Sequence, residues 1–119
     1  MTDLNVELWR VAHGRAGDKG NRSNISVIAW DAQFYPLIAG QITVERVKEQ
    51  FSSRQPTRVY RFDLPNLHAF NFVLDDVLEG GVNSSLNLDG HGKALSFHLL
   101  AISIKVPSRM ANLLRKCIE

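Results

Sequence analysis

The sequence predicts an α+β domain in which two helices cover one face of a mostly antiparallel sheet. Three observations support this prediction. Several segments show the alternation of apolar and polar residues that is typical of strands, and two segments show apolar residues at helical spacing. The order of these segments lacks the regular strand and helix alternation of a doubly wound fold.

The first half of the chain contains two predicted strands and one predicted helix. Residues 5–13 predict a strand, because apolar and polar residues alternate there and the apolar Val11 and Ala12 precede His13. Residues 24–31 predict a second strand that is apolar enough for the centre of a sheet. Residues 34–38 begin irregularly or as a short helical turn, because Pro36 restricts the residue before it. Thr43 is a suitable N-cap for a helix near residues 43–52, which has apolar residues at helical spacing.

The middle of the chain pairs a strand with an unusually apolar segment. Residues 57–64 alternate, with Tyr60, Phe62 and Leu64 on one face, as in a half-exposed strand. Residues 66–79 predict a helix that begins after Pro65 and has one narrow polar stripe. The stripe consists of His68, Asn71, Asp75 and Glu79. Such a helix lies either deep in its own fold or against a partner.

The last third of the chain predicts a hairpin and a tail helix. Gly80 and Gly81 end the preceding helix, residues 84–89 alternate, and residues 89–92 carry a turn signal. The alternation changes register near Leu99, through a bulge or a helical turn within residues 95–100, before a strand at 101–106. We expect one domain over residues 1–119, with a core at about 5–106 and a tail helix at about 108–118. A ferredoxin-like sandwich is the nearest common plan.

Composition and charge exclude several classes of protein. A content of 45% hydrophobic and 22% charged residues is that of an ordinary globular domain. The net charge of +2 and the absence of a basic run argue against nucleic-acid binding. The single cysteine, Cys117, fits a reducing compartment, and no apolar run approaches the roughly 20 residues of a membrane span. The chain has no paired Cys/His spacing for zinc. We therefore expect a cytoplasmic protein that binds no metal, membrane or nucleic acid.

Residues 13–24 carry the strongest functional signal. Three glycines at a spacing of three share a predicted loop with basic side chains, an aspartate, a histidine and asparagines. Glycine lets the backbone come close to a bound group, and basic side chains hold anions. We therefore predict an anion or substrate site formed by Arg15, Gly17, Asp18, Lys19, Gly20, Asn21 and Asn24, with Arg22 as a further base. The alternative is a structural loop whose glycines only make turns.

Few groups in this chain are suited to catalysis. His13 and Asp18 are the candidate proton-transfer residues, and Ser23 is the nearest nucleophile. No third group that could orient them is evident, so we expect little activity from the chain alone. His68 and Asn71 either are solvated or point into the site or an interface.

Three motifs in order resemble the small ferredoxin-fold domain of the acyclic terpene utilisation protein family. They are AHGRAGDKGN at residues 12–21, LPNLHAFNFVL at 64–74 and SLNLDGHGK at 85–93. The resemblance covers residues from about 8 to 106 and leaves out the tail after Pro107. Family members either carry this domain after a large N-terminal domain or encode it as a separate small protein beside one.

The resemblance implies a small subunit that pairs with a large subunit in branched acyl-CoA or carboxylic acid catabolism, with hydratase or lyase chemistry. A homo-oligomer could cover the apolar segment when the large subunit is absent. The family has no agreed catalytic residues to carry over to this chain. No covalent cofactor is expected, and a CoA thioester or a carboxylate is the expected ligand. The alternative is a free-standing ligand-binding or regulatory module without catalysis, as many ferredoxin-like domains are.

Overall fold

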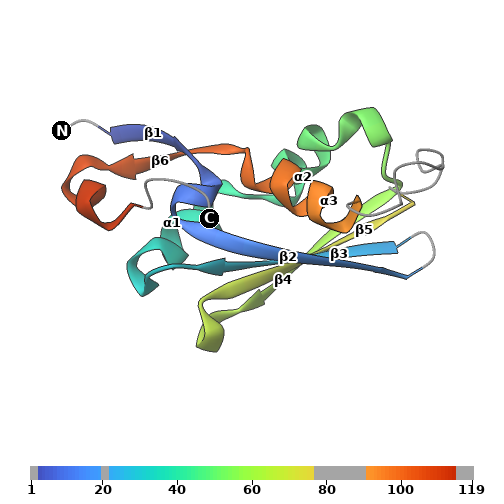
Figure 1. The fold of residues 1–119 in the computed structure, drawn as a ribbon, viewed down its shortest axis with the longest axis horizontal. Helices are drawn as coiled ribbons and strands as arrows, with labels where there is room; N and C mark the ends of the chain where they lie inside the picture. The colour runs from blue at the N-terminus through green and yellow to red at the C-terminus, as the bar shows by residue number, and fades with distance from the viewer. Residues whose placement is uncertain (1–2, 20–21, 77–90, 115–119) are drawn as a thin grey trace.

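A four-stranded antiparallel sheet in the order β2-β3-β5-β4 organises the fold (Figure 1). The structure is a computed structural model that describes residues 3–19, 22–76 and 91–114. Its strands are β1 (Asp3–Glu7), β2 (Ala12–Lys19), β3 (Arg22–Ala29), β4 (Arg58–Leu64), β5 (Ala69–Asp75) and β6 (Ser103–Pro107). Its α-helices are α1 (Tyr35–Gln41), α2 (Val44–Gln50) and α3 (His91–Leu100). Short 3₁₀ helices are η1 (Leu8–Arg10), η2 (Ala32–Phe34), η3 (Ser52–Arg54), η4 (Pro65–Leu67) and η6 (Ser108–Leu113).

The strand order is that of a split strand-helix-strand unit. β3 and β4 are each antiparallel to β5, which lies between them, so β3 and β4 point the same way. α1 and α2 connect them, as in ferredoxin-like domains. The outer neighbour of β3 is its hairpin partner β2, whereas β6 leaves this sheet and pairs with β1. The predicted α+β class with antiparallel sheets is confirmed.

One face of the four-stranded sheet is covered and the other is open. Figure 1 shows α2 and α3 on the same side of this sheet. Phe70 and Phe72 of β5 are fully buried on that side, next to Ile25 and Val27 of β3. The core continues to the small sheet, where Val106 is also buried in the same cluster.

Three predicted elements are confirmed. The helix expected at 43–52 is α2, and its cap is Thr43, whose Oγ1 accepts a hydrogen bond from the Arg46 N–H at 3.2 Å. The strands expected at 57–64 and 101–106 are β4 and β6. Capping and alternation are local patterns, so they can be recognised in the sequence of each segment alone.

The prediction of one continuous N-terminal strand is wrong. The segment expected as one strand at 5–13 is split by η1, whose Leu8 is fully buried. The Leu8 N–H donates to the Ile102 carbonyl, and the Trp30 N–H donates to the Val11 carbonyl. The 3₁₀ turn therefore carries the chain from the small sheet to the large one.

The prediction of a helix at residues 66–79 is wrong as far as residue 76, and residues 77–79, with Glu79 of the predicted stripe, lie outside the described residues. This segment forms η4 and then the central strand β5, which ends at Asp75. Phe70, Phe72 and Leu74 face the helices, and the residues between them face the other side. Of the two expectations for this apolar segment, burial in its own fold is the one observed for its described part, because β5 is flanked by β3 and β4.

The C-terminal third also differs from the prediction. Residues 95–100 belong to α3, so the change of register near Leu99 marks a helix and not a bulge. The helix predicted after Pro107 is the 3₁₀ helix η6, which buries Met110. The predicted helix end at Gly80 and Gly81, the alternation at 84–89 and Cys117 lie outside the described residues. Among the described helices, none has the length and hydropathy needed to cross a membrane.

Candidate functional site

The predicted glycine loop at residues 13–24 is a β-hairpin. Residues of β2 pair with β3 from Ala12–Ala29 to Lys19–Arg22. Gly17 pairs with Asn24 in this ladder, and a Cβ at Gly17 would meet no atom within 4 Å, so nothing there requires glycine. The expectation of a loop was wrong because a strand with small and polar residues lacks the apolar alternation that marks most strands.

The structure describes this predicted site only in part. The backbones of Asp18 and Lys19 belong to β2, but their side chains lie outside the described part. Gly20 and Asn21, which join the two strands, also lie outside it. The residues that can be placed are therefore those at the start of β2 and along β3.

The uncovered face of the four-stranded sheet, here called the open face, brings two of the family-like motifs together. Arg15 of β2 lies opposite Ser26 of β3, which in turn lies opposite Asn71 of β5. Side chains of directly opposed residues lie on the same face of a sheet. Arg15 and Asn71, which are 56 positions apart, therefore share one row of the open face.

This polar row is suited to bind an anion. The Ser26 hydroxyl lies 3.5 Å from Asn71 Oδ1, and both side chains are half-buried. Arg15 is exposed and makes no hydrogen bond to any described side chain, so its guanidinium is available to a carboxylate or phosphate. Asn24 belongs to the next row, opposite Gly17.

A second row, near the hairpin end, is ionic. Arg22 binds Asp75 in a bidentate pair, with Nε–Oδ1 at 2.6 Å and Nη2–Oδ2 at 3.1 Å. This hydrogen bonding lowers the pKa of Asp75 and raises the pKa of Arg22. Arg58 lies opposite Asp75 from β4 and donates to the Tyr60 hydroxyl at 3.3 Å, which raises the pKa of Arg58. Asp75 is thus an ion-pair partner and not a proton donor at neutral pH.

The rest of the open face is apolar. Phe62 is 53% exposed, Leu64 is 39% exposed, and Trp30 beyond the end of β3 is 41% exposed. The alternation of residues 57–64 predicted a half-exposed strand, and the structure shows that its aromatic face is the exposed one. Leu67 of η4, 65% exposed, lies at the end of this zone.

Arg61 explains why the aromatic face of β4 turns outward. Its guanidinium lies on the helix side, where Nη1 donates to the carbonyls of Ala39 and Ile42 at 2.8 and 3.1 Å. A cation at the C-terminal end of α1 satisfies carbonyls that the helix leaves unpaired. Asp63 holds the same guanidinium through Nε–Oδ1 at 2.8 Å. Since these two polar residues face the helices, Phe62 faces out.

The two predicted proton-transfer residues lie apart. His13 and Asp18 are five positions apart on the extended strand β2, about 16 Å along its length. The His13 ring packs against Trp30 with 4.3 Å between ring centroids. The structure therefore places His13 in the apolar zone and not beside Asp18.

His68 lies at the end of the sheet and outside the polar row. It follows η4 with a left-handed φ of 51°, and its carbonyl accepts from the Ala29 N–H at 2.9 Å. Its exposed ring meets Tyr35 edge-on at 6.0 Å. Asn71, which the sequence grouped with His68 on one stripe, instead points to the open face with Arg15.

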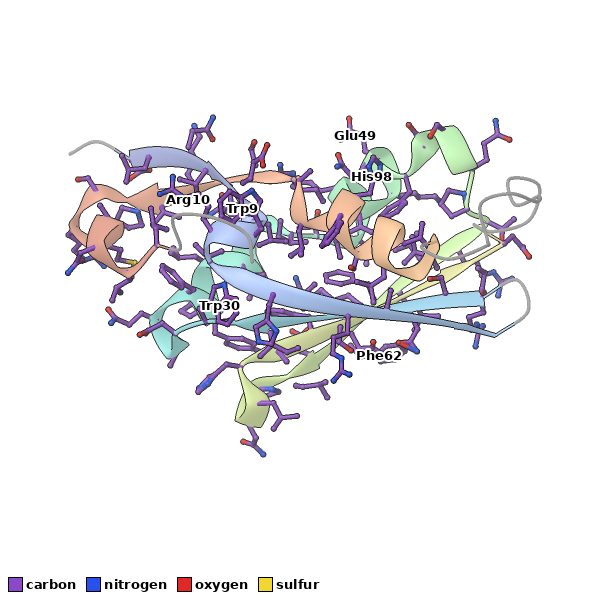
Figure 2. The ribbon with its side chains drawn as sticks, in the orientation of Figure 1. Trp9, Arg10, Trp30, Glu49, Phe62 and His98 are labelled. Atoms are coloured by element: carbon purple, nitrogen blue, oxygen red, sulfur yellow. The ribbon has the colours of Figure 1, made fainter. Side chains whose placement is uncertain are left out.

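A surface cavity of about 420 Å³ lies on the helix side of the molecule. It is lined by Arg46, Glu49, Gln50, Ala101, Ile102 and Ser103. Figure 2 shows Glu49 and His98 on the opposite side of the sheet from Phe62. The cavity is thus separate from the open face. Within residues 3–19, 22–76 and 91–114, no three His, Cys, Asp or Glu side chains group as metal ligands.

Comparison with known proteins identifies one family. The model of the family described as the AtuA ferredoxin-like domain matches residues 6–105. The matched region contains the four-stranded sheet, the three described α-helices, the last two residues of β1 and most of β6. No curated protein and no solved structure matches the chain.

Proposed function

This chain belongs to the family of AtuA ferredoxin-like domains, and we propose that it is a small subunit that pairs with a large subunit of the acyclic terpene utilisation type. The pair acts in the breakdown of branched acyl-CoA compounds or carboxylic acids, with hydratase or lyase chemistry. The chain contributes the open face of its sheet as the docking and anion-binding surface. The large subunit contributes the catalytic groups, because the candidate proton-transfer residues of this chain do not come together in its described part.

The observation that carries this proposal is the uncovered sheet face. Phe62, Leu64 and Trp30 are exposed together on or beside it, although a small domain gains free energy by covering such side chains. Exposed apolar patches of this kind mark interaction sites. Aromatic residues and arginines are also enriched at protein interfaces. Family motifs at residues 12–21 and 64–74 both contribute strands to this face.

The separation of His13 and Asp18 supports an accessory role. Proton transfer requires a donor or base within about 3 Å of the reacting atom, and two groups about 16 Å apart cannot serve one small reacting centre. Arg15, Ser26 and Asn71 are better suited to hold an anion than to move a proton. A carboxylate or the phosphate of a CoA thioester fits this row.

Docking is tested by co-expression of this chain with the large family subunit from the same genome. We expect a stable complex that Phe62→Ala weakens at least about tenfold, as for a central aromatic contact. Phe97→Ala is the matched control, because Phe97 of α3 is 55% exposed and Phe62 is 53% exposed. If both variants bind the large subunit equally well, the open face is not the docking surface. If the wild type forms no complex with the large subunit, the proposed function is refuted.

The anion role is tested separately by calorimetry with an acyl-CoA or a dicarboxylate and the assembled pair. We expect Arg15→Ala and Lys19→Ala to weaken binding about tenfold each, the loss of one charge-assisted hydrogen bond. Arg109→Ala in η6 controls for the loss of positive charge elsewhere. If the Arg15 and Arg109 variants bind equally well, the polar row is not the anion site.

A second candidate is a free-standing ligand-binding module. The cavity of about 420 Å³ beside α2 and β6 favours it, because small-molecule sites have volumes of this order. This candidate predicts ligand binding by the chain alone that Ser103→Trp abolishes and Phe62→Ala leaves intact. The small-subunit proposal predicts instead that Phe62→Ala weakens assembly with the large subunit and that Ser103→Trp leaves assembly intact.

A further inference from the structure

We infer that the open face receives an acidic surface of a different protein and not a second copy of this chain. The inference rests on the proposed function and adds the chemistry of the partner surface. It is drawn from the charges of the described residues on the open face and from their places in the sheet.

The open face is positively charged. Its described charged side chains are Arg15, Arg22, Arg58 and Asp75, and together these four carry a net charge of +2. Asp75 is already bound by Arg22 at two positions. Arg58 donates a hydrogen bond to a neutral hydroxyl, and Arg15 makes no hydrogen bond to another described residue. The positive charge that remains available therefore comes from Arg15 and Arg58.

This charge disfavours pairing of two identical faces. In a twofold dimer each copy contributes the same patch, so two faces of charge +2 would be pressed together. Asp75, the carboxylate among the described side chains of each face, would have to leave its bidentate pair with Arg22 to meet the other copy. Like charges across an interface suppress pairing, whereas carboxylates on a partner would accelerate it.

The positions of the two arginines define the partner surface further. Arg15 lies on edge strand β2 and Arg58 on edge strand β4, three strand spacings apart. Arg15 shares its row with Phe62, which is four positions from Arg58 along β4. The two Cα atoms are therefore about 20 Å apart on a diagonal. The matching surface presents two carboxylate groups at about this separation, with apolar side chains near them to meet Phe62 and Leu64. The guanidinium of Arg15 has five N–H donors, so it can pair with a partner carboxylate and still donate to a bound anion.

The test measures association of the large family subunit with charge-reversed variants of this chain. We expect Arg15→Glu and Arg58→Glu each to slow association about tenfold at about 50 mM salt, and the difference to shrink at about 500 mM salt. Arg109→Glu makes the same charge change in η6 and should leave the rate nearly unchanged. Arg15→Gln should give a smaller effect in the same direction as Arg15→Glu.

Self-association is measured on the chain alone by sedimentation. We expect Phe62→Ala to leave the sedimentation of this chain unchanged at high micromolar concentration, because two copies do not meet through this face. A wild-type dimer that Phe62→Ala dissociates would overturn the inference.

The outcomes separate this inference from the function on which it rests. If charge reversal has no effect while Phe62→Ala still weakens the complex, the docking face stands and the acidic partner surface is refuted. If the large subunit binds neither the wild type nor the variants, the proposed function and this inference both fall.

Discussion

Among Gly14, Gly17 and Gly40, Gly14 is the position where an added side chain would meet close neighbours. It lies on the helix-facing side of β2, opposite Val27, and α3 packs over it. A Cβ at this position would be 3.1 Å from the Ser26 carbonyl oxygen and 3.6 Å from the Leu100 side chain. The backbone oxygen cannot move aside as a flexible side chain can. The Ser26 carbonyl of the neighbouring strand therefore leaves little room for a side chain at Gly14, and the added Cβ would already be in van der Waals contact with Leu100 of α3.

We predict that Gly14→Val lowers the free energy of unfolding by about 1 to 3 kcal/mol, because overpacking forces the helix and strand apart. Gly17→Val is the matched control on the same strand, since a Cβ there would meet nothing within 4 Å. Urea denaturation of both variants measures the difference. Equal stability of the two variants would contradict the close approach of α3.

At the scale of elements, β6 is protected along the edge that β1 does not cover. The Gln41 side chain pairs with both backbone groups of Lys105, with each hydrogen bond 2.8 Å long. Arg46 donates to the Ser103 carbonyl at 2.7 Å. These side chains occupy positions that a neighbouring strand would otherwise take, which limits pairing with another chain.

We predict that Gln41→Leu costs about 2 kcal/mol of unfolding free energy, about 1 kcal/mol for each lost hydrogen bond. Gln33→Leu, on the exposed side of η2, makes the same chemical change without such bonds and should cost little. Thermal unfolding of the two variants provides the comparison. Hydrogen exchange at the Lys105 amide should also become faster in Gln41→Leu and remain slow in Gln33→Leu.

A second pair of elements is joined by a reciprocal contact. Gln50 of α2 donates from Nε2 to the His98 carbonyl at 2.7 Å, and His98 Nε2 lies 2.7 Å from the Gln50 carbonyl. The His98 ring also meets Phe51 edge-on at 4.9 Å. The two helices on the covered face are thus held to each other as well as to the sheet.

At the scale of the whole molecule, the fold has one covered and one open sheet face. Phe72 and Phe62 illustrate the difference, because both are strand phenylalanines and only Phe72 is fully buried. Phe72 packs under the helices, whereas the Phe62 ring contacts the exposed side of the sheet at Tyr60, with 6.3 Å between ring centroids. The stability of the isolated chain therefore depends on the covered face.

We predict that Phe72→Ala costs about 3 to 5 kcal/mol of unfolding free energy. Phe62→Ala should cost less than about 1 kcal/mol, the size of a cross-strand contact on an exposed surface. Chemical denaturation of the isolated variants measures both values. A large loss for Phe62→Ala would mean that the open face is covered in the isolated chain.

The sequence by itself determined the elements whose signals are local. Thr43 caps α2 by accepting a hydrogen bond from Arg46, three residues further on. The alternation of β4 is likewise evident within its own seven residues. The α+β class followed from such segments and from their order. The order of the elements also suggested the ferredoxin-like plan, which the family match supports.

Local signals were ambiguous where strands are apolar on both faces. Residues 66–79 satisfied a helical pattern, yet Phe70, Phe72 and Leu74 also alternate with Asn71 and Asp75 at a period of two. A central strand can be apolar on either face, because neighbouring strands and helices cover it. The competing period of two was the signal that could have identified β5.

Only the tertiary structure decided which residues share a surface. Arg15 and Asn71 come together because β3 lies between their strands in a defined register, and a shift by one residue would turn either side chain to the other face. The outward turn of Phe62 depends likewise on Arg61 reaching the end of α1. Strand order and register depend on contacts between distant segments, so no local pattern in the chain contains them.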